Sequence, residues 1–126
     1  MSTQGYIAII DDDESLCRSL SRLLQQVGLP SISFSSAEKF LVHEGIDRYS
    51  CLLLDVQLPG LSGIDLHREL IARGVRTPVI YVTAYDDSAT RAKASASGCE
   101  GFFRKSDPGP DIIAAIRRAI AADMPD

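Results

Sequence analysis

Acidic side chains follow two strand-length apolar runs of this sequence, at the point where each run ends. Asp11 and Asp12 come directly after Ile7–Ile10, and Asp55 comes directly after Cys51–Leu54. If the two runs are neighbouring parallel strands, their carboxyl ends bring the three carboxylates together. Two carboxylates about 5 Å apart repel each other by roughly 3 kcal/mol at an effective dielectric constant near 20. A fold that gathers three of them needs a compensating cation, so the sequence predicts a metal-dependent site.

Two more polar residues stand at the ends of later apolar runs. Thr83 ends the fourth run and Lys105 follows the fifth. Open α/β sheets place their ligands at the carboxyl ends of the strands, so both side chains should converge on the acids. Taken alone, Thr83 is more typical of an ordinary β-branched strand residue. Lys105 alone is equally typical of a solvated lysine at a strand end.

The elements that must position these side chains alternate regularly along the chain. Five β/α units in succession predict a parallel sheet with helices on both faces. A flavodoxin-like (βα)5 fold with strand order 2-1-3-4-5 places the site at the ends of the first and third strands. The predicted strands cover 6–10, 31–34, 50–54, 79–83 and 101–104, and the predicted helices cover 15–27, 36–42, 64–74, 87–97 and 111–122.

Composition narrows the class of protein. A chain of 126 residues with 45% apolar residues is the size of one domain with a real core. We interpret residues 1–123 as that domain and 124–126 as a tail or the start of a linker. The net charge of −4 argues against direct nucleic-acid binding. No secretory signal or membrane-length apolar run is visible, and three widely spaced cysteines suit a cytoplasmic location.

The motifs together resemble the receiver domain of bacterial two-component response regulators, most closely those attached to helix-turn-helix transcription factors. The resemblance covers nearly the whole chain. Each motif is weak alone, but their order and intervals are specific. The matching stretches are Ile9–Asp13, Leu54–Gly60, Leu61–Gly63, Val82–Ala84 and the position of Lys105.

The resemblance implies a phosphoryl-transfer site in a phosphorelay rather than a conventional enzyme. Asp55 would accept a phosphoryl group from a sensor histidine kinase. Asp12, Asp55 and the main-chain carbonyl of Gln57 would bind Mg²⁺, with Mn²⁺ as a substitute, and Asp11 would act through a bound water. A few carboxylates combined with waters and a phosphate oxygen suit Mg²⁺ better than Ca²⁺.

The resemblance also implies a switch. Lys105 and the Thr83 hydroxyl would each contact a phosphoryl oxygen, and Thr83 would move toward it. Phe102 would then turn inward, changing the face formed by the fourth helix, fifth strand and fifth helix. That face would control a partner or an attached DNA-binding domain, with a phosphorylation-dependent homodimer as one outcome. Gln57 and Tyr85 would tune the rate of phosphoryl loss, which we expect to be slow.

One position departs from the family pattern, and two histidines lie outside it. Ser106 follows Lys105 where receivers usually carry proline, often with a cis peptide bond. We expect a trans bond here, because a cis bond before a residue other than proline costs about 3 kcal/mol. The different path of the loop puts the reach of Lys105 in question. His43 and His67 have no evident partner in the sequence, and we interpret both as surface residues.

Three other functions remain as alternatives. A degenerate receiver would bind partners without phosphorylation, but all five site positions are present. A phosphatase of the haloacid dehalogenase type also uses Asp and Mg²⁺, but requires a second Asp where this chain has Gln57. A flavin or nucleotide module on the same fold would need a phosphate cradle after the first strand, where Asp11 and its acidic neighbours would repel phosphate.

Overall fold

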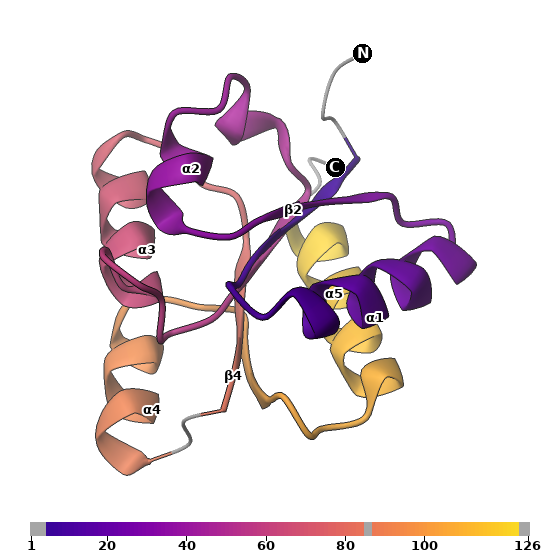
Figure 1. Cartoon of the computed structure of the whole chain (residues 1–126). Coiled ribbons are helices and arrows are strands. Elements are labelled where there is room, and N and C mark those ends of the chain that lie inside the picture. Colours follow the sequence, from indigo (N-terminus) through magenta and orange to yellow (C-terminus); the bar gives the residue numbers. More distant parts are fainter. Residues whose placement is uncertain (1–4, 85–86, 124–126) are drawn as a thin grey trace.

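The computed structural model of the chain describes residues 5–84 and 87–123, which form a parallel sheet between two layers of helices (Figure 1). The strands are β1 Ile7–Ile10, β2 Ser31–Phe34, β3 Cys51–Leu54, β4 Val79–Thr83 and β5 Gly101–Arg104. The helices are α1 Glu14–Gln26, α2 Ala37–Leu41, α3 Gly63–Ala72, α4 Ser88–Ala96 and α5 Gly109–Asp123, with a 3-10 turn η1 at Ile46–Arg48.

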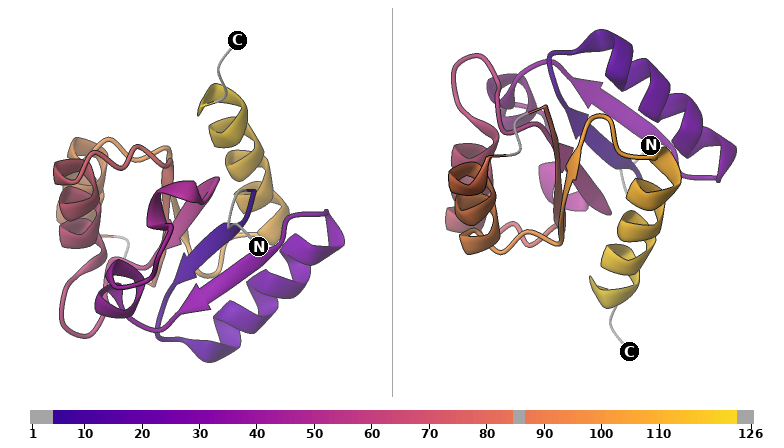
Figure 2. Two further views of the ribbon diagram at one scale, coloured as in Figure 1. Left: turned by 90° about the horizontal axis from the view of Figure 1, so that it is seen from above. Right: turned by 90° about the horizontal axis from the view of Figure 1, so that it is seen from below.

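The strand order is β2-β1-β3-β4-β5, with every neighbouring pair parallel, which confirms the predicted flavodoxin-like topology. Helices α1 and α5 cover one face of the sheet, and α2, α3 and α4 cover the other (Figures 1 and 2). The central strands β1, β3 and β4 are buried at every position, because helices exclude water from both of their faces. This arrangement leaves the strand ends as the accessible part of the sheet.

Alternation along the strands divides the core into two clusters. Ala8, Leu52 and Tyr81 point toward α2, α3 and α4. Ile9 and Leu53 point toward α1 and α5. The phenylalanines of β5 divide in the same way, with Phe102 against the first cluster and Phe103 against the second.

Helix boundaries follow local capping chemistry. Asp13 begins α1 by accepting a hydrogen bond from the Leu16 N–H at 3.1 Å. Gly28 follows the end of α1 with φ of 80°, a backbone conformation that glycine adopts without a steric penalty. Helix α5 starts two residues before its predicted start, with Pro110 in the first turn, where the missing N–H costs no helical hydrogen bond.

The spacing of Ser35 and Glu38 in the sequence predicts a capping box at the start of α2, but this prediction is wrong by one residue. Ser36, not Ser35, is the N-cap, and its hydroxyl accepts from the Lys39 N–H at 3.1 Å. The Glu38 carboxylate does not complete a box. It instead accepts from the Leu61 N–H at 2.8 Å, across the gap between α2 and the loop after β3.

None of the described helices is long and apolar enough to cross a membrane. The proposed tail at 124–126 lies outside the described residues.

Candidate metal centre

The register of β1 and β3 brings the predicted acids together. Ile10 is paired with Leu54, so the next residue on each strand is an aspartate. The ladder continues one step further, because the Asp55 N–H donates to the Ile10 carbonyl at 3.1 Å. Asp11 and Asp55 are therefore neighbours across the strand ends, and each is only 4% exposed.

Asp12 completes the acidic cluster from the solvent side, since it is exposed. Carboxylate oxygens of Asp11, Asp12 and Asp55 lie within 4.8 Å of one another. Among the described residues, this is the one group of three or more acids, cysteines or histidines close enough to share a metal ion. The predicted convergence of these three carboxylates is therefore present in the structure.

Lys105 reaches the same cluster from the end of β5. Its Nζ lies 3.0 Å from Asp55 Oδ2 and 3.1 Å from Asp11 Oδ2. The Lys105 N–H also donates to the Thr83 carbonyl at 2.9 Å, which continues the β4–β5 pairing beyond the strands. The Lys105–Ser106 peptide is trans, as expected, and no peptide bond among the described residues is cis. Proline after the lysine is thus not required for its reach.

Burial and the neighbouring charges shift the pKa values of Asp11 and Lys105. Burial, together with the negative charge of Asp55, raises the pKa of Asp11 to about 6, although hydrogen bonds from the Asp13 N–H and Lys105 oppose the shift. Burial alone would favour the neutral amine of Lys105. Hydrogen bonds to Asp55 and Asp11 outweigh burial and raise the pKa of Lys105. The ammonium is therefore firmly charged at neutral pH.

The donor set fits a divalent cation. Three carboxylates of Asp11, Asp12 and Asp55 against the one ammonium of Lys105 leave a formal charge of −2. Lys105 bridges two of the three acids, and the exposed Asp12 carboxylate faces water. Oxygen ligands that are partly open to water are what Mg²⁺ prefers, because it retains several of its own waters.

The loop after β3 is folded tightly beside Asp55. The Gln57 N–H donates to Asp55 Oδ1 at 3.1 Å, and the Gly63 N–H donates to the Val56 carbonyl at 3.0 Å. A Cβ atom at Gly63 would overlap the Asp55 carbonyl oxygen. The loop can therefore approach Asp55 this closely only because residue 63 has no side chain.

The predicted switch residues lie on adjoining strands. Thr83 is fully buried at the end of β4. Phe102 on β5 is half-buried, with its ring centroid 6.3 Å from that of Tyr81, and the Arg91 guanidinium lies 4.7 Å above the Phe102 ring. Phe102 is thus placed between the core and α4. Tyr85, the other predicted rate-tuning residue, lies outside the described residues.

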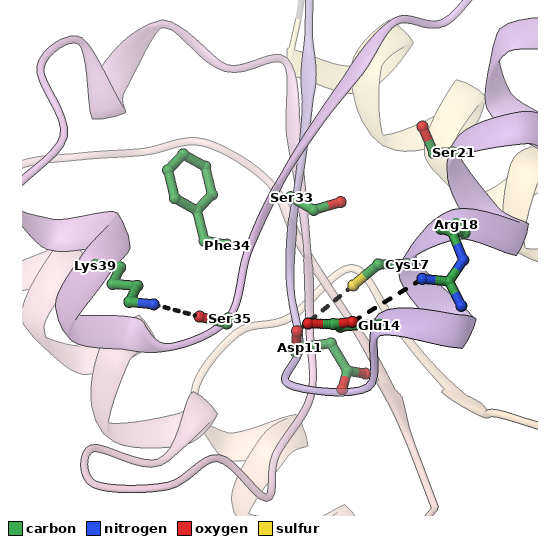
Figure 3. Close-up of a pocket in the computed structure, with 9 residues that line it drawn as sticks. All are labelled: Asp11, Glu14, Cys17, Arg18, Ser21, Ser33, Phe34, Ser35 and Lys39. Carbon is green, nitrogen blue, oxygen red and sulfur yellow. Dashed lines mark hydrogen bonds and ion pairs between the residues drawn. The ribbon is translucent and has the colours of Figure 1, made fainter.

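A pocket of about 480 Å³ lies beside the acidic cluster, between α1, β2 and the start of α2 (Figure 3). Asp11 and Cys17 line it, and the Cys17 thiol donates to the Asp11 carbonyl at 3.5 Å. On the other side of β2, the Lys39 ammonium donates to the Ser35 hydroxyl at 2.9 Å. Asp12, Asp55 and Lys105 do not line this pocket. The pocket therefore adjoins the acidic cluster and shares only Asp11 with it.

The interpretation of His67 as a surface residue is wrong. His67 on α3 is buried, with Nδ1 3.2 Å from the Tyr81 hydroxyl and 3.1 Å from the Ser97 hydroxyl. The Ser97 hydroxyl also donates to the Ala94 carbonyl at 2.6 Å, so His67, Tyr81 and Ser97 form one buried hydrogen-bonded cluster. Burial raises the pKa of Tyr81 to about 12, so its hydroxyl keeps the proton. No residue near His67 in the sequence indicates this burial, because its partners Tyr81 and Ser97 lie far along the chain.

Comparison with known proteins identifies the class. Residues 7–117 match the response regulator receiver domain family. The chain is 35% identical over 122 residues to Nodulation protein W of Bradyrhizobium diazoefficiens, covering 97% of this chain and 54% of that protein. It is 37% identical over 117 residues to the response regulator protein TmoT of Ectopseudomonas mendocina, covering 93% of this chain and 53% of that protein.

Solved structures agree with this. The crystal structure of FixJ-N superposes with a TM-score of 0.85 at 31% identity, covering 98% of this chain and 99% of that one. The response regulator StyR gives a TM-score of 0.86 at 30% identity, covering 94% and 60% of the two chains. The chain therefore belongs to the response regulator receiver domain family of two-component systems. It spans about half the length of the curated relatives that it matches.

Proposed function

We propose that Asp55 is the phosphoacceptor of this receiver domain and that its donor is a sensor histidine kinase. An Asp55 carboxylate oxygen would form a new O–P bond while the N–P bond of the kinase phosphohistidine breaks. The departing imidazole would take up a proton. The observation that carries this proposal is the convergence of Asp11, Asp12 and Asp55 with Lys105 at the strand ends.

Mg²⁺ is the cofactor that this donor set fits, with Mn²⁺ as a substitute. Asp12, Asp55 and the Gln57 carbonyl would hold the ion, and Asp11 would act through a water molecule. Once bound, the ion would neutralise charge on the phosphoryl oxygens. Lys105 would bind a second phosphoryl oxygen and the Thr83 hydroxyl a third. Lys105 already lies 3.0 Å from Asp55, which supports this role.

Phosphorylation would be read out on the face formed by α4, β5 and α5. Movement of Thr83 toward the phosphoryl group would open space into which Phe102 turns. The Arg91 guanidinium on the Phe102 ring would then have to move, and this would couple the change to α4. The altered face would engage a partner or a second copy of the chain.

The setting and output of the domain follow from the same proposal. We place it in the cytoplasm, where a kinase could reach it, with no direct nucleic-acid contact of its own. FixJ of Azorhizobium caulinodans, 36% identical, is named a transcriptional regulatory protein. This name supports a receiver that controls a DNA-binding output. Tyr85 would shade the phosphoryl group from attacking water, whereas Gln57 would hold a water near it, and we expect the net loss of the phosphoryl group to be slow.

The test is intact-mass measurement after incubation with acetyl phosphate and Mg²⁺. Wild-type protein should gain one phosphoryl group per chain, and Asp55→Asn should gain none. Labelling of Asp55→Asn at the wild-type level would place the acceptor elsewhere. Omission of Mg²⁺ should abolish labelling, and a phosphoryl half-life on the scale of seconds would contradict the expected slow loss. Failure of the wild type to label would favour a receiver that acts without phosphorylation.

A further inference from the structure

The loop that carries Gln57 has a well-anchored base and a tip that needs separate support. At its base, Gln57 bonds to Asp55 and Gly63 bonds to Val56. Its tip, Pro59–Leu61, is not part of the sheet or of a helix. Because the proposed metal ligand at Gln57 is a main-chain carbonyl, its position depends on the conformation of the whole loop.

Glu38 holds that tip from another part of the chain. Its Oε2 accepts from the Leu61 N–H at 2.8 Å, a contact between residues 23 positions apart. This hydrogen bond lowers the pKa of Glu38, so the acceptor is an ionised carboxylate, which makes the bond stronger than a neutral one. A Cβ atom at Gly60 would lie 2.6 Å from the same Oε2. Glycine at position 60 therefore gives the carboxylate room to reach Leu61.

Glu38 stands on a firmly anchored helix turn. Ser36 caps α2, and two residues beyond Glu38 the ring of Phe40 is fully buried. The Phe40 ring centroid lies 5.2 Å from that of Phe34 on β2 and 5.8 Å from that of Tyr49. Because these contacts hold α2 in place, the Glu38 side chain can restrain the loop to which it is hydrogen-bonded.

We propose that Glu38 is a positioning residue of the phosphoacceptor site: it fixes the tip of the loop after β3 and thereby the Gln57 carbonyl that would bind the metal. This rests on the proposed function above. Glu38 touches neither Asp55 nor the other acids through any described contact, and it acts through the backbone at Leu61. Its removal should loosen metal binding and slow phosphorylation while leaving the acceptor carboxylate and Lys105 in place.

The experiment compares Glu38→Ala, Glu38→Gln and the control Glu44→Ala, in which an exposed acid just beyond α2 is removed. Mg²⁺ affinity is measured by isothermal titration calorimetry, and the rate of acetyl phosphate labelling by intact mass. Glu38→Ala should weaken Mg²⁺ binding and slow labelling by roughly threefold to tenfold, at or below the usual cost of losing an outer-shell partner of a metal site. Glu38→Gln should fall between wild type and Glu38→Ala, because an amide oxygen still accepts from the Leu61 N–H, although in a weaker, neutral hydrogen bond. Glu44→Ala should match wild type.

Each result separates this inference from the proposed function. If Glu38→Ala binds Mg²⁺ and labels as wild type does, the positioning role is wrong, while Asp55-dependent labelling still stands. If Glu38→Gln is as impaired as Glu38→Ala, charge rather than hydrogen-bond acceptance matters, and the role is again wrong. If wild-type protein is not labelled, or if Asp55→Asn labels equally, the proposed function itself fails. Because Glu38 is exposed, all three variants should fold, and urea unfolding verifies that they do.

Discussion

The Lys105 ammonium lies 3.0 Å from the Asp55 carboxylate, although the two residues follow strands β5 and β3, which are not adjacent in the sheet. The same ammonium lies 3.1 Å from Asp11, and its side chain is only 21% exposed. One lysine therefore neutralises part of the repulsion between two buried acids. Lys105 therefore holds the acidic cluster together, in addition to the phosphoryl contact that we propose for it.

Replacement of Lys105 should destabilise the metal-free protein. In Lys105→Met the buried acids lose their shared cation, so the free energy of unfolding should fall by about 1–3 kcal/mol at pH 7, somewhat less than for a fully buried pair. Mg²⁺ should restore more stability to this variant than to wild type. Urea unfolding with EDTA or with Mg²⁺ measures both effects, with the exposed Lys93→Met as control. Equal stability of Lys105→Met and wild type without metal would contradict the prediction.

His67 should make stability fall on mild acidification. Burial lowers the pKa of His67 from its ordinary value of 6.5. The unfolded chain then binds a proton more readily than the folded chain. The contribution of neutral His67 to the free energy of unfolding is therefore fully present above pH 6.5 and is lost as the pH falls through the folded pKa. The raised pKa of Asp11 acts in the opposite direction, so the wild type must be compared with His67→Gln.

Urea unfolding at several pH values provides that comparison. The difference in unfolding free energy between wild type and His67→Gln should shrink as pH falls below 6.5. At pH 7 the substitution should lower the free energy of unfolding by about 1–3 kcal/mol, because the Tyr81 and Ser97 hydroxyls lose a buried hydrogen-bond partner. His43→Gln, at a half-buried position, is the matched control. A difference that does not vary with pH would show that His67 does not titrate as the structure implies.

Gly63→Ala should be destabilising in spite of its helical position. Alanine at the start of α3 would gain up to about 1 kcal/mol in helix propensity. The new Cβ would overlap the Asp55 carbonyl oxygen, and such overpacking costs about 1–3 kcal/mol. The net effect should be a lower unfolding midpoint and slower phosphorylation, measured by thermal unfolding and by acetyl phosphate labelling. An unchanged midpoint would mean that the loop relaxes without cost.

The three cysteines should react unequally with a thiol reagent. Cys51 is fully buried, with its pKa raised by burial to about 12, and Cys17 is 7% exposed. Cys99 is half-buried and should be modified first, about tenfold or more ahead of the others, which react only after local opening. Peptide mapping by mass spectrometry after brief labelling checks the order. Early modification of Cys17 would indicate that the pocket beside Asp11 admits the reagent.

The sequence by itself determined the family, the five β/α units and the gathering of Asp11, Asp12 and Asp55. The family follows from the resemblance of the motifs. The β/α units follow from periodicity along the chain, and the gathering of the acids follows because an acid after a buried strand must lie at the end of the sheet. The position of Lys105 after the fifth strand predicted that its side chain approaches the acids, but its contact with two of them is visible only in the folded chain.

Tertiary structure alone decided where polar side chains found partners. Glu38 matched a local capping pattern but bonds to Leu61, and His67 resembled a surface residue but is buried against Tyr81. A local pattern records which residues are near in sequence, whereas a hydrogen bond between distant elements depends on how helices dock on the sheet. The docking of α3 buries His67 beside Tyr81, and the docking of α2 brings the exposed Glu38 within reach of Leu61, so both partners are decided by the tertiary structure.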